Sequence, residues 1–135
     1  MNILFICKHN RFRSRVANSY FDKINKSKNF ASKGCGLFSD NNPLDESEIK
    51  AAMELGIDIT GKPIKLNSKL IEWSDLIVVV ADDVPDLFAN SNKQVLRWEI
   101  KDCSEGDSIE DIKKTVKLIM NNVEKLLLQL EKEAK

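Results

Sequence analysis

The sequence has little cysteine, histidine, proline and glycine, and it contains no long hydrophobic run. Three cysteines are an odd number, which excludes a complete intramolecular disulfide framework, and the single histidine argues against a structural zinc site. The longest central apolar run, at residues 76–81, is far shorter than a membrane span. The 21 Lys and Arg balance 21 Asp and Glu, unlike a typical nucleic-acid-binding domain. We therefore expect no metal, no nucleic acid and no membrane as partners.

The beginning of the sequence also lacks the features of a secretory signal peptide. The apolar run at residues 3–6 is short, and neither a basic leader nor a small-residue cleavage site accompanies it. We therefore expect a cytoplasmic location, where thiols stay reduced. The 135 residues fit one domain, residues 1–135, and 42% apolar with 31% charged residues is typical of soluble globular proteins.

Short apolar runs alternate with helical patterns along the chain. The pattern predicts an α/β fold with a four-stranded parallel sheet flanked by helices on both faces. Strands are expected at residues 2–7, 30–35, 76–81 and 94–100, helices at 14–26, 45–55, 67–73 and 108–133, and a turn or short helix at 85–90. The last helix has heptad-like apolar spacing, and packing on the sheet is favoured over a coiled coil. We expect a monomer, with a weak dimer as the alternative.

The richest chemical signal follows the first predicted strand. Cys7 stands at the carboxyl end of that strand, where open parallel sheets bind their ligands. The loop between strand 1 and helix 1, residues 8–13, directs backbone N–H groups toward one point and forms an anion nest. Such a nest favours the thiolate form of cysteine. Arg13 offers a fork for two phosphate oxygens, Ser14 can donate to the thiolate and cap the helix, and Asn10 tolerates a left-handed backbone.

Basic residues are concentrated between residues 7 and 28, and acidic residues between 40 and 58. The neutral total therefore hides a cationic segment directly after the first predicted strand. We expect this positive charge to meet a phosphate group at Cys7.

The pattern Cys7-x5-Arg13-Ser14 resembles the opening of the low-molecular-weight protein tyrosine phosphatases, whose relatives include thioredoxin-coupled arsenate reductases. Only this loop is diagnostic alone, but the likeness extends to residues 32–35, 42–43, 54–59, 73–79 and 98–102. The resemblance implies a metal-independent and cofactor-free phosphatase. It would hydrolyse phosphotyrosine-type monoesters, on a protein or a small molecule, through a phosphocysteine intermediate.

The resemblance also implies roles for individual residues. Cys7 takes the place of the nucleophile, and Arg13 that of the arginine which stabilises the transition state. Asp102 takes the place of the general acid, and Asp107 is the reserve candidate. Phosphate-binding or supporting positions fall on Lys8, His9, Asn10, Arg11, Phe12, Ser14 and Ser32.

The sequence departs from the family pattern in several places. The Asp-Pro pair of the family is Asp102 followed by Cys103 here, and the aromatic residues that often follow the acid are missing. Phe12 replaces a second loop cysteine, so the usual vicinal disulfide cannot form. His9 replaces a common glycine and is expected at the mouth of the site. A redox bond between Cys7 and Cys103 is one alternative role for Cys103.

Two other residue groups receive simpler interpretations. Cys35 is expected to be a small buried residue. The acidic residues at 82, 83 and 86 are more typical of a surface turn than of a metal site.

Two other functions compete with phosphatase activity. Thioredoxin-coupled arsenate reduction needs two further cysteines near the third strand, and residues 81–86 contain none. A non-catalytic phosphate- or phosphopeptide-binding module would leave Cys7 incidental. Within the phosphatase hypothesis, the substrate is phosphotyrosine, phosphoarginine or a small phosphate ester.

Overall fold

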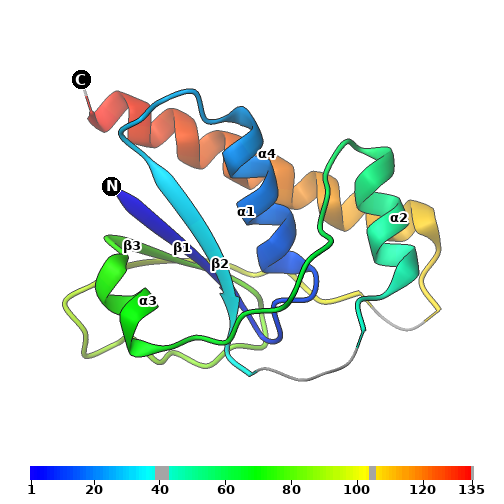
Figure 1. The fold of residues 1–135 in the computed structure, drawn as a ribbon, viewed down its shortest axis with the longest axis horizontal. Coiled ribbons are helices and arrows are strands. Elements are labelled where there is room, and N and C mark those ends of the chain that lie inside the picture. The colour runs from blue at the N-terminus through cyan, green and yellow to red at the C-terminus, as the bar shows by residue number, and fades with distance from the viewer. Residues whose placement is uncertain (39–42, 104–105, 135) are drawn as a thin grey trace.

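The structure is a computed structural model that describes residues 1–38, 43–103 and 106–134. Strands and helices alternate along most of the chain (Figure 1). In order they are β1 (Asn2–Cys7), α1 (Arg13–Ile24), β2 (Ala31–Gly36), α2 (Glu46–Glu54), α3 (Ser68–Trp73), β3 (Leu76–Val80), β4 (Gln94–Trp98) and α4 (Ile109–Glu133). No helix in these described segments has the length and apolar character needed to cross a bilayer.

The four strands form one parallel sheet in the order β2-β1-β3-β4. β1 is therefore a central strand, and its register places Ile3 between Ser32 of β2 and Leu76 of β3. Central strands of a parallel sheet are covered on both faces, which explains the continuous apolar run of β1 and β3. The predicted fold class is confirmed.

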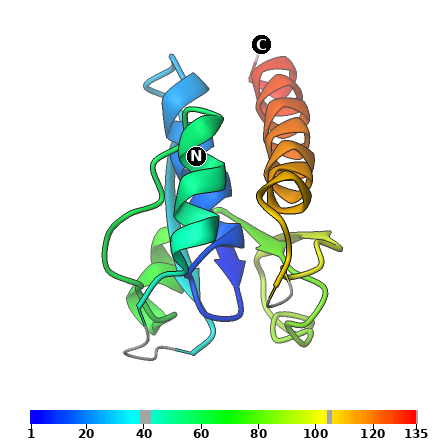
Figure 2. The same ribbon diagram turned by 90° about the vertical axis from the view of Figure 1, so that its right-hand side faces the viewer.

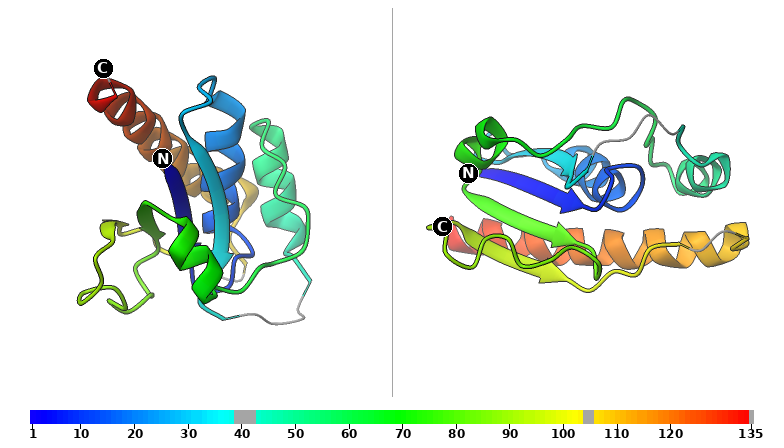
Figure 3. Two further views of the ribbon diagram at one scale, coloured as in Figure 1. Left: turned by 60° about the vertical axis from the view of Figure 1, so that its left-hand side comes forward. Right: turned by 90° about the horizontal axis from the view of Figure 1, so that it is seen from below.

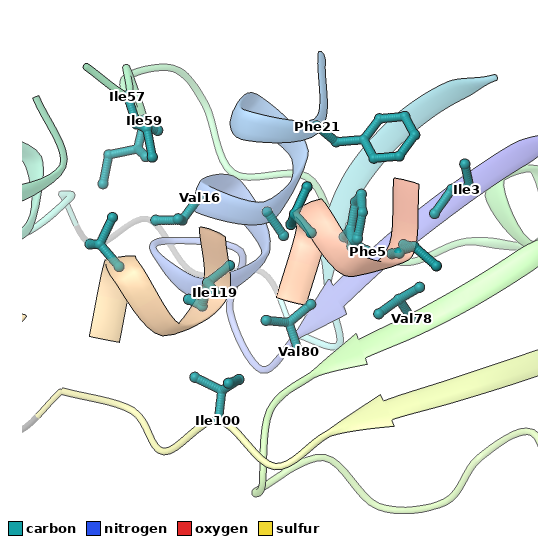
Figure 4. Packing of buried hydrophobic residues seen from close by; sticks show 14 of the residues in the cluster. Ile3, Phe5, Val16, Phe21, Ile57, Ile59, Val78, Val80, Ile100 and Ile119 are labelled. Atoms are coloured by element: carbon teal, nitrogen blue, oxygen red, sulfur yellow. The ribbon is translucent and has the colours of Figure 1, made fainter. Parts of the chain in front are cut away.

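Helices cover the two faces of the sheet unequally. Side chains alternate along β1, so that Ile3 and Phe5 enter one core cluster and Leu4 and Ile6 enter the other. The first cluster packs against α1, α2 and α4, and Figure 4 shows its side chains between the helices and the strands. The second cluster packs against α3, which lies in front of the sheet in the left-hand view of Figure 3.

The long helix α4 lies beside α1 and α2 (Figure 2). Its apolar seam includes Val116, Ile119 and Val123, which are fully buried in the larger core cluster. The seam thus faces the interior of the same chain, as the sequence pattern favoured. Burying each such side chain contributes about 1.5–3 kcal/mol relative to leaving it exposed.

Some predicted boundaries are wrong. α1 begins at Arg13 and ends at Ile24, because Asn25 adopts an extended conformation, and β4 ends at Trp98 rather than at residue 100. Residues 85–90, predicted as a turn or short helix, contain a turn and no helix. Of residues 42–43, which carry part of the family resemblance, residue 42 lies outside the described residues.

The carboxyl ends of the strands share one edge of the molecule, seen at the arrow tips in the right-hand view of Figure 3. The loop after β1, the bend after β3 and the segment after β4 meet there, and α2 and the first turns of α4 extend beside them. The topology thus gathers residues from the whole length of the chain at the end of β1.

Candidate active site

A hydrogen-bond network surrounds the Cys7 thiol at the end of β1. Cys7 is buried, and its Sγ lies 3.0 Å from Ser14 Oγ. Asn10 Nδ2 donates to Ser14 Oγ at 2.6 Å, and Asn10 Oδ1 accepts from the Ile64 backbone N–H at 3.0 Å. Because the Ser14 oxygen accepts from Asn10, the Ser14 hydroxyl proton is free to point to Cys7. The network therefore supplies a donor for a thiolate.

The loop reaches this shape through two local features. Asn10 has a φ of 54°, the left-handed conformation expected from the sequence. Gly36, at the end of β2, lets the loop pass closely. A Cβ on Gly36 would lie 2.5 Å from His9 C and 2.6 Å from Asn10 N, which real structures do not tolerate. The backbone path of the loop therefore requires a glycine at the end of the neighbouring strand, β2.

Arg13 is buried at the start of α1, with 2% of its surface exposed. Its Nη1 donates to the carbonyl oxygen of Ile100 at 2.9 Å, and its Nη2 donates to Asp83 Oδ1 at 2.9 Å. Asp82 and Asp102 add ion pairs at 3.6 and 3.7 Å. These partners lie in the segments that follow β3 and β4, and they fix the guanidinium in place. The two hydrogen bonds use only part of its five N–H donors.

Cys7 and Arg13 line a pocket of about 630 Å³. Asp102 enters it from the segment after β4; half of its side chain is exposed, and its Oδ1 accepts from the Cys103 N–H at 3.0 Å. Asp107, the reserve candidate, lines the same pocket. The remaining lining residues come from the loop, the start of α2 and the segment before and within α4: His9, Arg11, Phe12, Pro43, Leu44, Asp45, Ser47, Glu48, Cys103, Gly106 and Ile112.

Glu48 is the pocket carboxyl group with the most altered acidity. Burial raises its pKa to about 7, and the negative charges of Asp102 and Asp45 add to this shift. The positive charges of Arg11 and Arg13 oppose it. Glu48 therefore exchanges a proton near neutrality inside the same pocket as Cys7.

The structure brings most of the predicted site residues together. Cys7, His9, Arg11, Phe12, Arg13 and Asp102 line the pocket, and Asn10 and Ser14 support Cys7 from beneath. His9 stands at the rim beside the Phe38 ring, with centroids 6.0 Å apart. Lys8 is not among the lining residues; its carbonyl oxygen accepts from Phe38 N at 2.9 Å.

Two predicted details differ from the structure. Ser32 points to α1, where its hydroxyl lies 2.7 Å from each of the acceptors Asn18 Oδ1 and Asp22 Oδ1, because it stands near the start of β2 and not at its carboxyl end. Ser14 does not cap α1: the capping position is Phe12, without a side-chain hydrogen bond. The Ser14 hydroxyl is engaged by Cys7 and Asn10 instead.

The sequence suggested a positively charged site after β1, but the basic residues there do not make the pocket uniformly positive. Arg13 is buried among aspartates, and Arg15 is half-buried behind the loop. Lys23 reaches the carbonyl oxygen of Gly56, away from the lining residues. The pocket lining also carries four carboxyl groups from outside the loop: Asp45, Glu48, Asp102 and Asp107.

The sequence did not indicate that Asp82 and Asp83 pair with Arg13, or that Glu48 lines the pocket. Both aspartates directly follow β3, the neighbour of β1, so the rule that strand ends converge was a usable signal. The position of Glu48 had no comparable signal, since it stands on a helix and not after a strand.

The other two cysteines are poor nucleophiles in this structure. Burial raises the pKa of Cys35 to about 12 and that of Cys103 to about 11. Cys103 nevertheless lines the Cys7 pocket, so a Cys7–Cys103 bond stays a hypothesis. Among the residues described here, no group of three or more His, Cys, Asp or Glu forms a candidate metal site.

These features define an α/β protein with a cysteine and an arginine in the loop after its first strand. The family model described as low molecular weight phosphotyrosine protein phosphatase matches residues 2–135, and the chain belongs to that family. No curated protein gives a significant match to the sequence.

Solved structures with the same fold carry different functional names. A YwlE mutant from Bacillus subtilis is 22% identical, with a TM-score of 0.82 over 97% of this chain and 99% of its own. An arsenate reductase from Archaeoglobus fulgidus is 27% identical, with a TM-score of 0.76 over 92% and 97%. The YwlE arginine phosphatase from Geobacillus stearothermophilus is 18% identical, with a TM-score of 0.83 over 98% and 94%.

Proposed function

We propose that this protein is a cysteine-dependent phosphatase that hydrolyses phosphomonoesters of the phosphotyrosine type. The observation that carries the proposal is the Cys7 thiol, 3.0 Å from the Ser14 hydroxyl, in a pocket that also contains Arg13 and Asp102. A nucleophile, an anion-binding cation and an acid at one strand end are the groups that phosphoryl transfer through a thiolate requires.

In the first step the Cys7 thiolate attacks phosphorus, an S–P bond forms and the P–O bond to the leaving group breaks. Asp102 transfers its proton to the departing oxygen, which leaves as a neutral alcohol or phenol. Arg13 and the backbone N–H groups of residues 8–13 stabilise the negative charge that spreads over the phosphoryl oxygens. The carboxylate of Asp83 and the Ile100 carbonyl keep the Arg13 guanidinium in place during this step.

In the second step the Asp102 carboxylate removes a proton from water, and the resulting nucleophile attacks the phosphocysteine. The S–P bond breaks, phosphate is released and Cys7 returns as a thiolate. The Ser14 hydroxyl donates to that thiolate and makes it a better leaving group. No cofactor or metal takes part in this sequence.

The first test replaces the nucleophile. Cys7→Ser should lower kcat on an aryl phosphate by at least about 10⁴-fold, because the serine hydroxyl is not ionised. Cys35→Ala is the matched control, because it removes a cysteine that lies outside the pocket lining. Full turnover by Cys7→Ser would remove the proposed mechanism, and binding of phosphate by wild type without any turnover would favour the non-catalytic binding module.

The second part of the test measures pH–rate profiles for Asp102→Asn and Asp107→Asn, with the exposed Asp86→Asn as the control. Loss of the proton donor should lower kcat by about 10²–10⁴-fold and remove the acid-dependent limb of the profile. An effect confined to Asp107→Asn would transfer the acid role to the reserve candidate. Arsenate-dependent oxidation of the three thiols, measured alongside, would favour the arsenate reductase function.

A second candidate substrate is phosphoarginine, because one of the similar solved structures is named an arginine phosphatase. The observation that favours it is the presence of four carboxyl groups in the pocket lining, because such a lining suits a leaving group with a positive charge. Comparing kcat/KM for peptides with phosphotyrosine and phosphoarginine decides between the two. We place the enzyme in the cytoplasm, where a reduced Cys7 is maintained.

A further inference from the structure

Arg15 links the phosphate-binding loop to a distant segment of the chain. It stands on α1 behind the loop and is not among the residues that line the pocket. Its Nε donates to the Asn10 carbonyl oxygen at 2.6 Å, and its Nη1 donates to the Ile59 carbonyl oxygen at 3.1 Å. The guanidinium therefore holds the left-handed loop residue against the segment that follows α2.

The chain after α2 is shaped around this guanidinium. Gly61 has a φ of 129°, and a Cβ added there would lie 3.2 Å from Arg15 Nη1. Arg15 Nη2 is buried, and among the described residues no hydrogen-bond partner meets it. Burial of a cation with one unpaired N–H group is costly, so a compensating negative charge is expected close by.

The group whose negative charge acts on Arg15 is Cys7. Burial lowers the pKa of Arg15, and the charge of Cys7 opposes this shift. Arg13 differs, since it forms ion pairs with three aspartates, Asp82, Asp83 and Asp102.

We propose that Arg15 is a positioning residue for the nucleophile, holding the Asn10 turn and placing a positive charge behind the loop that favours the Cys7 thiolate. This role rests on the proposed function. Arg15 acts through Asn10, because the Asn10 amide directs the Ser14 hydroxyl to the sulfur. It touches neither the substrate nor the reacting phosphorus.

Other charged or titratable groups face the Cys7 region from every neighbouring element, and any pH dependence includes them. They are His9, Arg11 and Arg13 from the loop and α1, Cys35 from β2, Glu48 from α2, Asp82 and Asp83 after β3, and Asp102 and Asp107 after β4. Because these groups are unchanged in a variant of Arg15 alone, a difference between variants reports Arg15.

The test measures the pH dependence of Cys7 alkylation by iodoacetamide, followed by mass spectrometry of the peptide that contains Cys7. Arg15→Gln should raise the midpoint of the alkylation profile by about one pH unit, which is about a tenfold slower alkylation below the midpoint. Arg15→Lys keeps the charge but loses the two-pronged hydrogen bonding. Its midpoint should stay near that of wild type while kcat falls.

The matched control is Arg97→Gln, which removes an arginine that pairs with Glu99 outside the pocket. An unchanged midpoint in Arg15→Gln, accompanied only by a lower melting temperature, would show a merely structural role. If circular dichroism shows that Arg15→Gln is unfolded, the test uses folded Arg15→Lys alone. A rise of about one pH unit in its alkylation midpoint would equally overturn the proposal. Alkylation needs no turnover. A phosphatase assay in which Cys7→Ser turned over as fast as wild type would therefore refute the proposed function, and the alkylation result could still be interpreted.

Discussion

Glu48 makes the stability of the folded protein depend on pH near neutrality. Its pKa rises from 4.5 to about 7 on folding, so the folded state binds the Glu48 proton more tightly than the unfolded chain does. Between these two values the contribution of Glu48 to stability falls as pH rises, and above pH 7 the buried charge is fully destabilising. The direction is opposite to that of a carboxylate held in an ion pair.

We therefore predict that Glu48→Gln is more stable than wild type at pH 8 by about 1 kcal/mol, a value reduced for the exposed part of the side chain. At pH 4.5 the two proteins should differ little. Urea unfolding at both pH values in a phosphate-free buffer measures the effect, and the exposed Glu46→Gln in the same helical turn is the control. An equal pH dependence in wild type and Glu48→Gln would contradict the assigned burial of the Glu48 charge.

At this scale the sequence predicts chemistry that is local in the chain. Cys7, Asn10 and Ser14 lie within one loop and helix start, and their types restrict what they do there. Arg15 and Glu48 could not be predicted, because their partners, Ile59 and Asp102, are brought to them by the tertiary fold. Ser32 was misplaced for the complementary reason: position along a strand, rather than residue type, decides which end of the sheet a hydroxyl faces.

Among the elements, β2 constrains the site most strictly although it contributes no catalytic group. Gly36 N donates to Ile64 O and its carbonyl oxygen accepts from Leu66 N, each at 2.8 Å, so the glycine is fixed between the loop and a neighbouring segment. A side chain at this position cannot be relieved by a rotamer change, because it would meet the backbone of His9 and Asn10.

We predict that Gly36→Ala destabilises the protein by about 1–3 kcal/mol and lowers kcat/KM by displacing the loop. Gly34→Ala is the matched control on the same strand, since its added Cβ would meet neighbours at 3.3–3.4 Å, where small shifts suffice. Thermal unfolding and aryl phosphate hydrolysis compare the two variants. Equal losses would show that the close approach at Gly36 is not what limits this position.

Element types were predictable because both periodicities are strong here: continuous β-branched residues in β3 and a regular apolar seam in α4. Element ends were less so. The predicted first helix overran α1 because its polar end continues the helical pattern, and the segment at 85–90 packs Phe88 into the smaller core cluster without forming a helix. The strand order was not predicted, because right-handed parallel connections limit the possible orders without selecting one.

For the whole molecule, the burial of the α4 seam bears on association. The apolar residues that would form a coiled coil already pack against α1 and the sheet, so α4 offers no such seam to a second copy. We predict a monomer of 15.3 kDa in sedimentation equilibrium over a wide concentration range. A mass that rises with concentration would favour the weak dimer instead.

The partners of Arg13 impose an order on the biosynthesis of the site. Arg13 and the Ile100 carbonyl that holds it are 87 residues apart, and Asp102 lies further on. A growing chain is synthesised from the N-terminal end, so the thiol of Cys7 exists well before the groups that orient the arginine. Until β4 joins the sheet, the nascent polypeptide contains the nucleophile without the groups that orient Arg13, so the site becomes complete only after β4 and the segment that follows it have been synthesised.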